Sequence, residues 1–322
     1  MALGDADNDG NLDILLANVL TGDIGLLLGN GDGTFQATQR TQLAETINAV
    51  LIASLGKPAQ GTSLVSGLAG FAVSLDFLQI GASGVAMPFP ALDRYASGLV
   101  VADLNQDGWP DLLAAGSNIA FYLGGPSGFS ALPVVSAGVA SPTPLADFNE
   151  DGIPDLVATS NGMVELFIGN GDGTFAAGQV IVSGESLFVG DLNEDGHQDL
   201  LVLESTGYTE LLGTGKGSFT QGSTVARTCV QTYFSTSPMY LLDLDGDGHL
   251  DLVELAFVDD GWGIKVELGN GDGTFQPGVA EPSIPADGSG VFGDLNNDGC
   301  PDLVVPHWWS DGNVDVFLNQ CR

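Results

Sequence analysis

The stretch DLNEDGHQDL, residues 191–200, places acidic side chains at alternate positions of a short segment. Asp191, Asn193, Asp195 and Asp199 occupy positions 1, 3, 5 and 9, and a glycine follows at position 6. Carboxylates packed this closely repel one another unless a cation neutralises them. A hard cation such as Ca²⁺ binds oxygen ligands at alternate positions of a loop that turns at a glycine. The segment therefore predicts a cation-binding loop. An inert Asp- and Gly-rich turn is the alternative.

The same pattern, D-x-[DN]-x-D-G-x-x-D, occurs six times in register, and this repetition favours cation binding over an inert turn. Its closing carboxylate at position 9 makes the loop shorter than the twelve-residue EF-hand loop. The expected side-chain ligands are Asp5, Asp7, Asp9 and Asp13; Asp103, Asn105, Asp107 and Asp111; Asp147, Asn149, Asp151 and Asp155; Asp191, Asn193, Asp195 and Asp199; Asp243, Asp245, Asp247 and Asp251; and Asp294, Asn296, Asp298 and Asp302.

The unusual charge of the chain is explained largely by these loops. Its 322 residues carry a formal charge of −34, and the expected ligand positions hold about half of the 41 Asp and Glu residues. Hydrophobic residues make up 44% of the chain, which is enough for a folded core rather than a disordered acidic chain. Only seven residues are Lys or Arg, so neither nucleic acid nor insertion into an anionic membrane is expected.

A second repeat, GNGDGTF, occurs identically at 29–35, 169–175 and 269–275, with looser copies at 124–129 and 213–219. Each copy follows an alternating apolar segment, which is typical of a β-strand that runs into a glycine-rich hairpin turn. Together with the strands that flank each Asp loop, this gives four strands in a unit of about 40–50 residues, the pattern of a propeller blade. The sequence therefore predicts an all-β propeller of four-stranded blades.

The interval between the first two Asp loops is long enough for one further blade. Aligning residues 49–67 with 98–116 places Ser54, Gly56, Pro58 and Ser63 at the four ligand positions. We therefore expect a diverged second blade, about residues 42–92, without a cation loop. This gives a seven-bladed propeller, a single domain over residues 1–322, with cation loops in six blades. The alternative is that residues 41–95 are an insertion with its own role.

The Asp loops followed by LGNGDGTF resemble the FG-GAP/VCBS repeats of bacterial proteins, which are similar to the integrin α-subunit propeller. This resemblance covers nearly the whole chain. It implies about six Ca²⁺ ions in the loops that join the first and second strands of the blades. It also implies that position 7 contributes its backbone carbonyl, and this position holds Asn11, Trp109, Ile153, His197, His249 and Cys300. Known roles in the family include adhesion, glycan binding and non-catalytic parts of larger secreted proteins.

The sequence does not indicate an enzyme. His197 and His249 lie inside the Asp loops, so we expect their side chains to point to solvent, and His307 has no matching Cys or Ser. Carboxylate pairs are so frequent in this acidic chain that they do not define a glycosidase site.

The best candidate for a recognition site is in the last two units, where the loops between second and third strands read FVDDGWG (257–263) and PHWWSDGN (306–313). Indole rings beside carboxylates suit a sugar ligand. Packing of these rings against one another or between blades is the alternative. The candidate residues are Trp262, Trp308, Trp309, Asp259, Asp260 and Asp311.

The three cysteines do not form a disulfide scaffold. Cys300 precedes the second strand of the last blade and Cys321 follows the third, so a bridge between them is expected. One bridge, together with loops suited to millimolar Ca²⁺, favours an extracellular or cell-surface location. Residue 5 already begins the first loop, so we expect any signal peptide to lie upstream of Met1.

Two hypotheses for the function follow. In the first, the propeller is a structural or adhesion module that binds itself or a cell-surface protein or glycan, and assembles into a fibre by strand addition. The last blade lacks a fourth strand, so Val314–Leu318 is an open edge that a segment upstream of Met1, the residues before Asp5 or a neighbouring subunit would cover. In the second hypothesis, the protein is a glycan-binding lectin.

Overall fold

The structure is a computed structural model. It describes residues 1–18, 22–42, 52, 98–116, 118–126, 129–135, 144–204, 207–226, 239–258, 261–282, 290–306 and 313–321. Every regular element in these ranges is a β-strand. No helix in the described part of the chain is long and apolar enough to cross a membrane.

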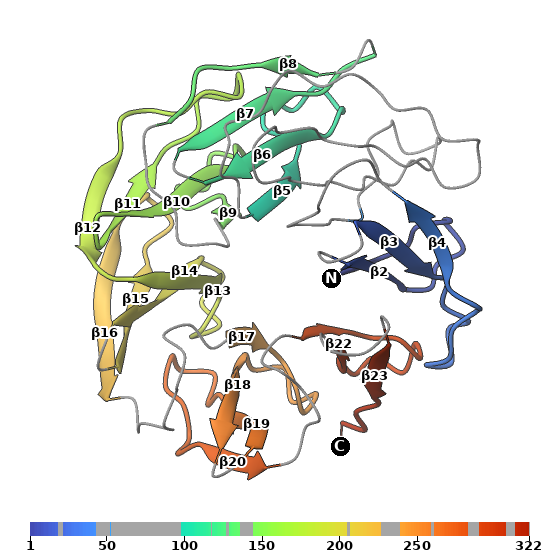
Figure 1. The fold of residues 1–322 in the computed structure, drawn as a ribbon. Helices are drawn as coiled ribbons and strands as arrows, with labels where there is room; N and C mark the ends of the chain where they lie inside the picture. Colours follow the sequence, from blue (N-terminus) through green and yellow to red (C-terminus); the bar gives the residue numbers. More distant parts are fainter. Residues whose placement is uncertain are drawn as a thin grey trace. The chain divides into compact units, whose positions relative to one another are not determined.

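The described strands form six antiparallel sheets, each a run of consecutive strands (Figure 1). Five sheets have four strands and the last has three. In chain order the sheets are β1 (Ala2–Gly4), β2 (Asp13–Asn18), β3 (Asp23–Leu27) and β4 (Gln39–Gln42); β5 (Gly98–Ala102), β6 (Asp111–Ala115), β7 (Ile119–Leu123) and β8 (Ser130–Ala131); β9 (Leu145–Ala146), β10 (Asp155–Ser160), β11 (Met163–Phe167) and β12 (Gln179–Ser183); β13 (Ser186–Gly190), β14 (Asp199–Glu204), β15 (Gly207–Gly213) and β16 (Phe219–Ala226); β17 (Met239–Leu242), β18 (Asp251–Val258), β19 (Gly261–Glu267) and β20 (Val279–Pro282); and β21 (Val291–Gly293), β22 (Asp302–Pro306) and β23 (Val314–Phe317).

The sheets are the four-stranded meanders of a β-propeller, as the sequence predicts. The predicted second blade, including Ser54, Gly56, Pro58 and Ser63, lies outside the described residues. The chain divides into two compact units, Met1–Leu145 with Asp151–Val182, and Ala146–Glu150 with Ser183–Arg322. The seven-blade count and the single domain therefore stay predictions.

The core lies around the second and third strands of the sheets. The second strand is buried on both faces, as β6 shows with Leu112 and Leu113 at 0% and 1% exposure, whereas the fourth strand is largely exposed. Because each second strand begins with an Asp-loop residue, burial of this strand fixes one end of the loop.

The phenylalanine that ends the GNGDGTF-type turn packs against an aromatic ring of the preceding sheet. The ring centroids lie 4.9 Å apart for Phe175 and Phe121, 5.7 Å for Phe219 and Phe148, and 5.8 Å for Phe275 and Tyr208. Two of these turns also form backbone hydrogen bonds to the Asp loop of the preceding sheet. Gly217 N–H donates to Phe148 O at 2.8 Å, and Gly273 N–H donates to Leu192 O at 2.9 Å. This motif, which the sequence indicates only as a hairpin turn, therefore also joins neighbouring sheets.

Candidate metal centres

Each Asp loop joins the first and second strands of one sheet, as expected from the resemblance. Position 6 is glycine in all six loops, with φ between 83° and 93°. A Cβ atom added at any of these glycines would meet nothing within 4 Å, so the positive φ angle, not crowding, requires glycine there. The residue at position 4 also has a positive φ angle, in the left-handed region. In five loops a non-glycine residue accepts this conformation: Asn8, Gln106, Glu150, Glu194 and Asn297.

The aspartates at positions 1 and 5 are turned into the loop by backbone hydrogen bonds. In loop 191–199, Asp191 accepts the N–H groups of Asp195 at 3.1 Å and Gly196 at 2.9 Å, and Asp195 accepts that of His197 at 2.9 Å. The first, second and last loops repeat this pattern at Asp5 and Asp9, Asp103 and Asp107, and Asp294 and Asp298. In the loop 243–251, Asp243 accepts the N–H groups of Gly246 at 2.8 Å and Gly248 at 2.9 Å. Asp151 and Asp247 accept from the position-7 residues Ile153 and His249 at 2.8 Å.

Position 9 has a structural role that the sequence does not reveal. All six aspartates here, Asp13, Asp111, Asp155, Asp199, Asp251 and Asp302, are 0% exposed. One Asp199 oxygen accepts the N–H of Leu192, position 2 of its loop, at 2.9 Å, and the other accepts the N–H of Gly213 at 2.6 Å. Asp13, Asp111, Asp251 and Asp302 make the equivalent pair of bonds, so this residue ties the loop to the end of the third strand.

Burial makes four of these carboxylates harder to ionise. Desolvation raises the pKa of Asp13, Asp111, Asp199 and Asp251, and the carboxylates at other loop positions raise it further, while the accepted N–H bonds oppose the shift. A bound cation would offset both the desolvation and the repulsion.

The structure brings three carboxylates together in two loops. The ligand atoms of Asp5, Asp7 and Asp13, and those of Asp243, Asp245 and Asp247, lie within 4.8 Å of one another. In three other loops position 3 is an asparagine whose Nδ2 donates to the position-5 aspartate at 2.9–3.0 Å: Asn105, Asn193 and Asn296. Asn149 holds this position in the remaining loop. Because the donor set consists of oxygen atoms, it fits a hard divalent cation such as Ca²⁺.

The position-7 histidines do not simply face solvent, so this expectation is corrected. His197 Nδ1 contacts Glu150 Oε1, and His249 Nδ1 contacts Glu194 Oε1. In each case the glutamate is position 4 of the preceding loop, and its hydrogen bond raises the pKa of the histidine. Cys300, the position-7 residue of the last loop, forms a disulfide with Cys321, with their Cα atoms 5.7 Å apart.

Most of the predicted aromatic-acidic patch lies outside the described residues, namely Asp259, Asp260, Trp308, Trp309 and Asp311. Trp262 is described. It lies in β19, half-buried, with its backbone paired to Phe257.

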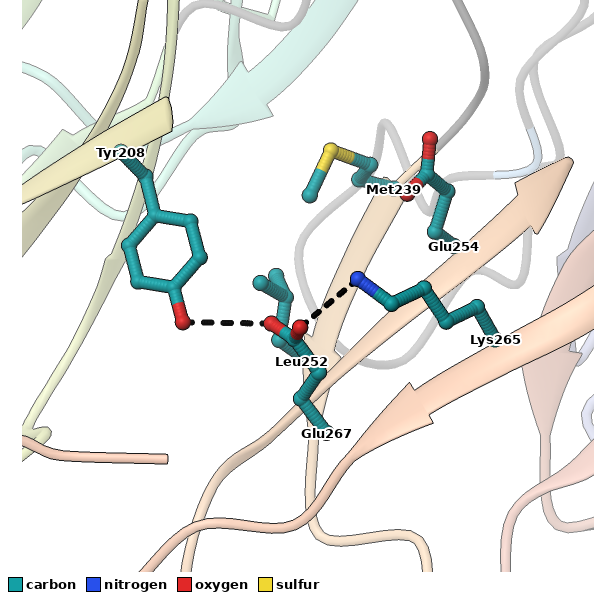
Figure 2. A pocket seen from close by; sticks show the side chains of 6 residues that line it. All are labelled: Tyr208, Met239, Leu252, Glu254, Lys265 and Glu267. Atoms are coloured by element: carbon teal, nitrogen blue, oxygen red, sulfur yellow. Dashed lines mark hydrogen bonds and ion pairs between the residues drawn. The ribbon is translucent and has the colours of Figure 1, made fainter. Parts of the chain in front are cut away.

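A small cavity in the second unit does not resemble a substrate site. Figure 2 shows its lining, in which Tyr208 OH donates to Glu267 Oε2 at 3.1 Å and Lys265 Nζ donates to Glu267 Oε1 at 2.7 Å. The cavity has room for about one water molecule. Burial raises the pKa of Tyr208, which keeps its hydroxyl a donor. We interpret this cluster as a buried polar contact within the core.

Comparison with protein families identifies the repeat. Residues 147–202, 191–254 and 243–305 match the FG-GAP-like repeat, a range that includes four of the six Asp loops. The chain thus carries FG-GAP-like repeats on a β-propeller fold, consistent with an FG-GAP β-propeller protein. Comparison with curated proteins finds no match.

Solved structures agree on the fold. A lectin from Agrocybe aegerita that recognises non-reducing terminal N-acetylglucosamine is 22% identical, with a TM-score of 0.61 over 95% of this chain and 90% of the lectin. BBS1N, in a complex with ARL6DN, is 11% identical with a TM-score of 0.59 over 98% and 90%. A Lactobacillus plantarum protein is 14% identical with a TM-score of 0.54 over 95% of both chains. At these identities the likeness is one of fold alone.

Proposed function

We propose that this protein is a secreted, calcium-binding seven-bladed propeller that serves as a non-catalytic structural or adhesion module. The observation that carries the proposal is the repeated loop in which aspartates at positions 1 and 5 are held inward and the position-9 aspartate is buried. Side chains at positions 1, 3, 5 and 9 would hold each ion, together with the position-7 carbonyl. Binding would neutralise the loop and stabilise the fold.

Counting bound metal tests this proposal directly. We expect about six Ca²⁺ per chain after dialysis against calcium, and none at Ser54, Gly56 and Pro58. A chain that binds no calcium would contradict the proposal, and a seventh ion would contradict the alignment of the second blade. The extracellular location is supported by the Cys300–Cys321 disulfide, because such bonds persist in oxidising compartments.

As partner for the structural role we propose a second copy of this chain, paired along β23. Phe317 and Leu318 are 37% and 48% exposed, whereas Phe167 in the third strand of a four-stranded sheet is 5% exposed. A strand added to β23 would cover this apolar edge. Phe317→Lys with Leu318→Lys should abolish oligomers in size-exclusion chromatography with light scattering. Met163→Lys, at a 42% exposed position on the covered strand β11, is the control.

Glycan binding is the second candidate. It is supported by the two Trp- and Asp-containing loops of the sequence and by a fold that a lectin also uses. Trp308→Ala and Trp262→Ala should each weaken binding to a glycan array without changing the melting temperature. If both variants instead lose stability equally, the indoles belong to the core and the candidate fails.

A further inference from the structure

Two pairs of successive Asp loops touch through the same positions, 4 and 7. Glu150, position 4 of loop 147–155, accepts a hydrogen bond from His197, position 7 of the next loop. Glu194 and His249 repeat this contact one loop further along the chain. The exposed fractions of the side chains are nearly equal in the two pairs, 32% for both histidines and 51% and 49% for the glutamates. Because the same contact recurs at equivalent positions, we interpret it as a feature of the repeat rather than a chance surface pair.

Neighbouring loops at either end of this series are joined in other ways. Gln106, again position 4, donates through Nε2 to the carbonyl of Gly152 in the next loop. At the other end, Gly246 occupies position 4, and a Cβ atom there would lie 3.0 Å from Sγ of Cys321, the disulfide partner of the position-7 residue Cys300. Position 4 of one loop therefore contacts the next loop in three consecutive cases, and in the fourth it lies beside the disulfide partner of that loop's position-7 residue.

The glycine-rich turns lie close beside the Glu–His contacts. A Cβ atom on Gly215 would lie 2.6 Å from Glu150 Oε1 and 2.8 Å from His197 Cε1. Gly271 has the same relation to the second pair, with a Cβ atom 2.9 Å from Glu194 Oε1. Both glycines have positive φ, 65° and 69°. The turn backbone therefore lies against each Glu–His pair, while about half of each glutamate side chain stays exposed.

We propose that Glu150 and Glu194 are positioning residues that, through His197 and His249, make cation binding in three consecutive loops mutually dependent. Position 4 lies between the expected ligands at positions 3 and 5, and position 7 supplies the expected carbonyl ligand. Ordering of loop 191–199 by an ion therefore restrains Glu194, which restrains the ring of His249 and, through it, loop 243–251. The second ion then binds a loop that is already partly ordered, which is positive cooperativity. This inference rests on the calcium binding proposed above.

The ring signals of the histidines provide a local test. Only His197, His249 and His307 are present, so the His249 ring reports occupancy of loop 243–251 in a calcium titration followed by NMR. Asp191→Ala disables the neighbouring loop and should raise the calcium midpoint at His249 about fivefold. In a Glu194→Asn background the same substitution should leave the midpoint unchanged. Asparagine occupies position 4 naturally as Asn8 and Asn297, so the left-handed backbone is preserved.

Two further variants distinguish a positioning role of Glu194 from a general effect of its negative charge. Glu194→Gln keeps an oxygen acceptor for His249 and should restore much of the dependence, whereas Glu185→Gln removes an exposed carboxylate outside the loops and should change nothing. Asp191→Asn replaces Asp191→Ala should the latter fail to fold. If the calcium midpoint at His249 is unchanged in the Asp191 variants, the coupling between loops is wrong, whereas the proposed calcium binding still holds. No calcium response of His249 in the wild-type protein would overturn the proposed calcium binding as well.

Discussion

Asp199 Oδ1 accepts the backbone N–H of Gly213 at 2.6 Å, and this bond joins the start of β14 to the end of β15. The other oxygen accepts the N–H of Leu192, so a single buried carboxylate satisfies two backbone groups. The residue expected as the closing ligand of a cation loop is therefore also part of the framework. Its two roles are separable by experiment.

Asp199→Ala should destabilise the protein even in the presence of a chelator. The substitution leaves two backbone N–H groups without acceptors, at about 1–3 kcal/mol each where they are buried. Asp191→Ala should cost much less, because its partners Asp195 and Gly196 are exposed and water replaces the lost acceptor. Thermal unfolding in EDTA compares the two variants. Equal losses would contradict the framework role of position 9.

Chelation should lower the melting temperature strongly. Each site at about 100 times its dissociation constant adds about 2.7 kcal/mol to the native state. Calcium should restore the melt better than Mg²⁺, because the smaller ion demands closer, more regular octahedral coordination. Scanning calorimetry in EDTA, then with each ion added back, makes the measurement. A melt that does not respond to EDTA would exclude calcium as part of the fold.

Glu210→Gln should flatten the pH dependence of stability. Glu210 is 2% exposed, and among the described residues its Oε1 has no hydrogen-bond partner. Burial raises its pKa above the ordinary value of 4.5, hydrogen bonds from Ser223 oppose this shift, and Asp272 and Asp199 add to it. Because the native state holds this proton more tightly than the unfolded state, its contribution is full below pH 4.5 and is lost as pH rises through the native pKa. The variant should melt higher than the wild-type protein at pH 8.

Melting curves from pH 4 to pH 8 at constant ionic strength would measure this effect. Glu185→Gln, which removes an exposed carboxylate from the same unit, is the matched control and should leave the pH dependence intact. Parallel curves for the wild-type protein and Glu210→Gln would show that the buried carboxylate does not titrate in this range.

Loss of the Cys300–Cys321 disulfide should destabilise the native state by about 3 kcal/mol, because the bridge closes a loop of 21 residues. The double variant Cys300→Ala and Cys321→Ala should melt lower than the wild-type protein, and a reducing agent should lower the wild-type melt to a similar value. A variant with an unchanged melt would mean that strand pairing alone holds β22 and β23 together.

Much of the fold could be predicted because its repeats are local. Period-2 alternation and glycines at fixed offsets determine strands and turns, and six copies of the Asp loop confirm the unit. The proximity of Cys300 and Cys321 followed from the same reasoning, since antiparallel strands bring their ends together.

Contacts between neighbouring sheets and loops could not be predicted in this way. Position 4 varies among Asn, Gln, Glu and Gly, so only the three-dimensional arrangement reveals that Glu194 meets His249. The aromatic pairing of Phe219 with Phe148 was missed for the same reason, because its partners lie 71 positions apart in motifs that differ. A signal was present in the invariant phenylalanine of the turn, which a simple hairpin does not require.

The contact that this turn makes with the preceding sheet affects how the number of repeats in the chain can change. Gly217 and Gly273 each donate a backbone hydrogen bond to position 2 of the preceding Asp loop, whereas Phe219 packs on Phe148 of that loop and Phe275 packs on Tyr208 of β15. The backbone bond is thus the same at these two junctions, and the aromatic partner differs. Duplicating a segment from one Asp loop to the next would keep this backbone bond at the new junctions, because it depends on no particular side chain. A change in the number of repeats would therefore keep the backbone part of each junction, while the aromatic partner would have to be adjusted.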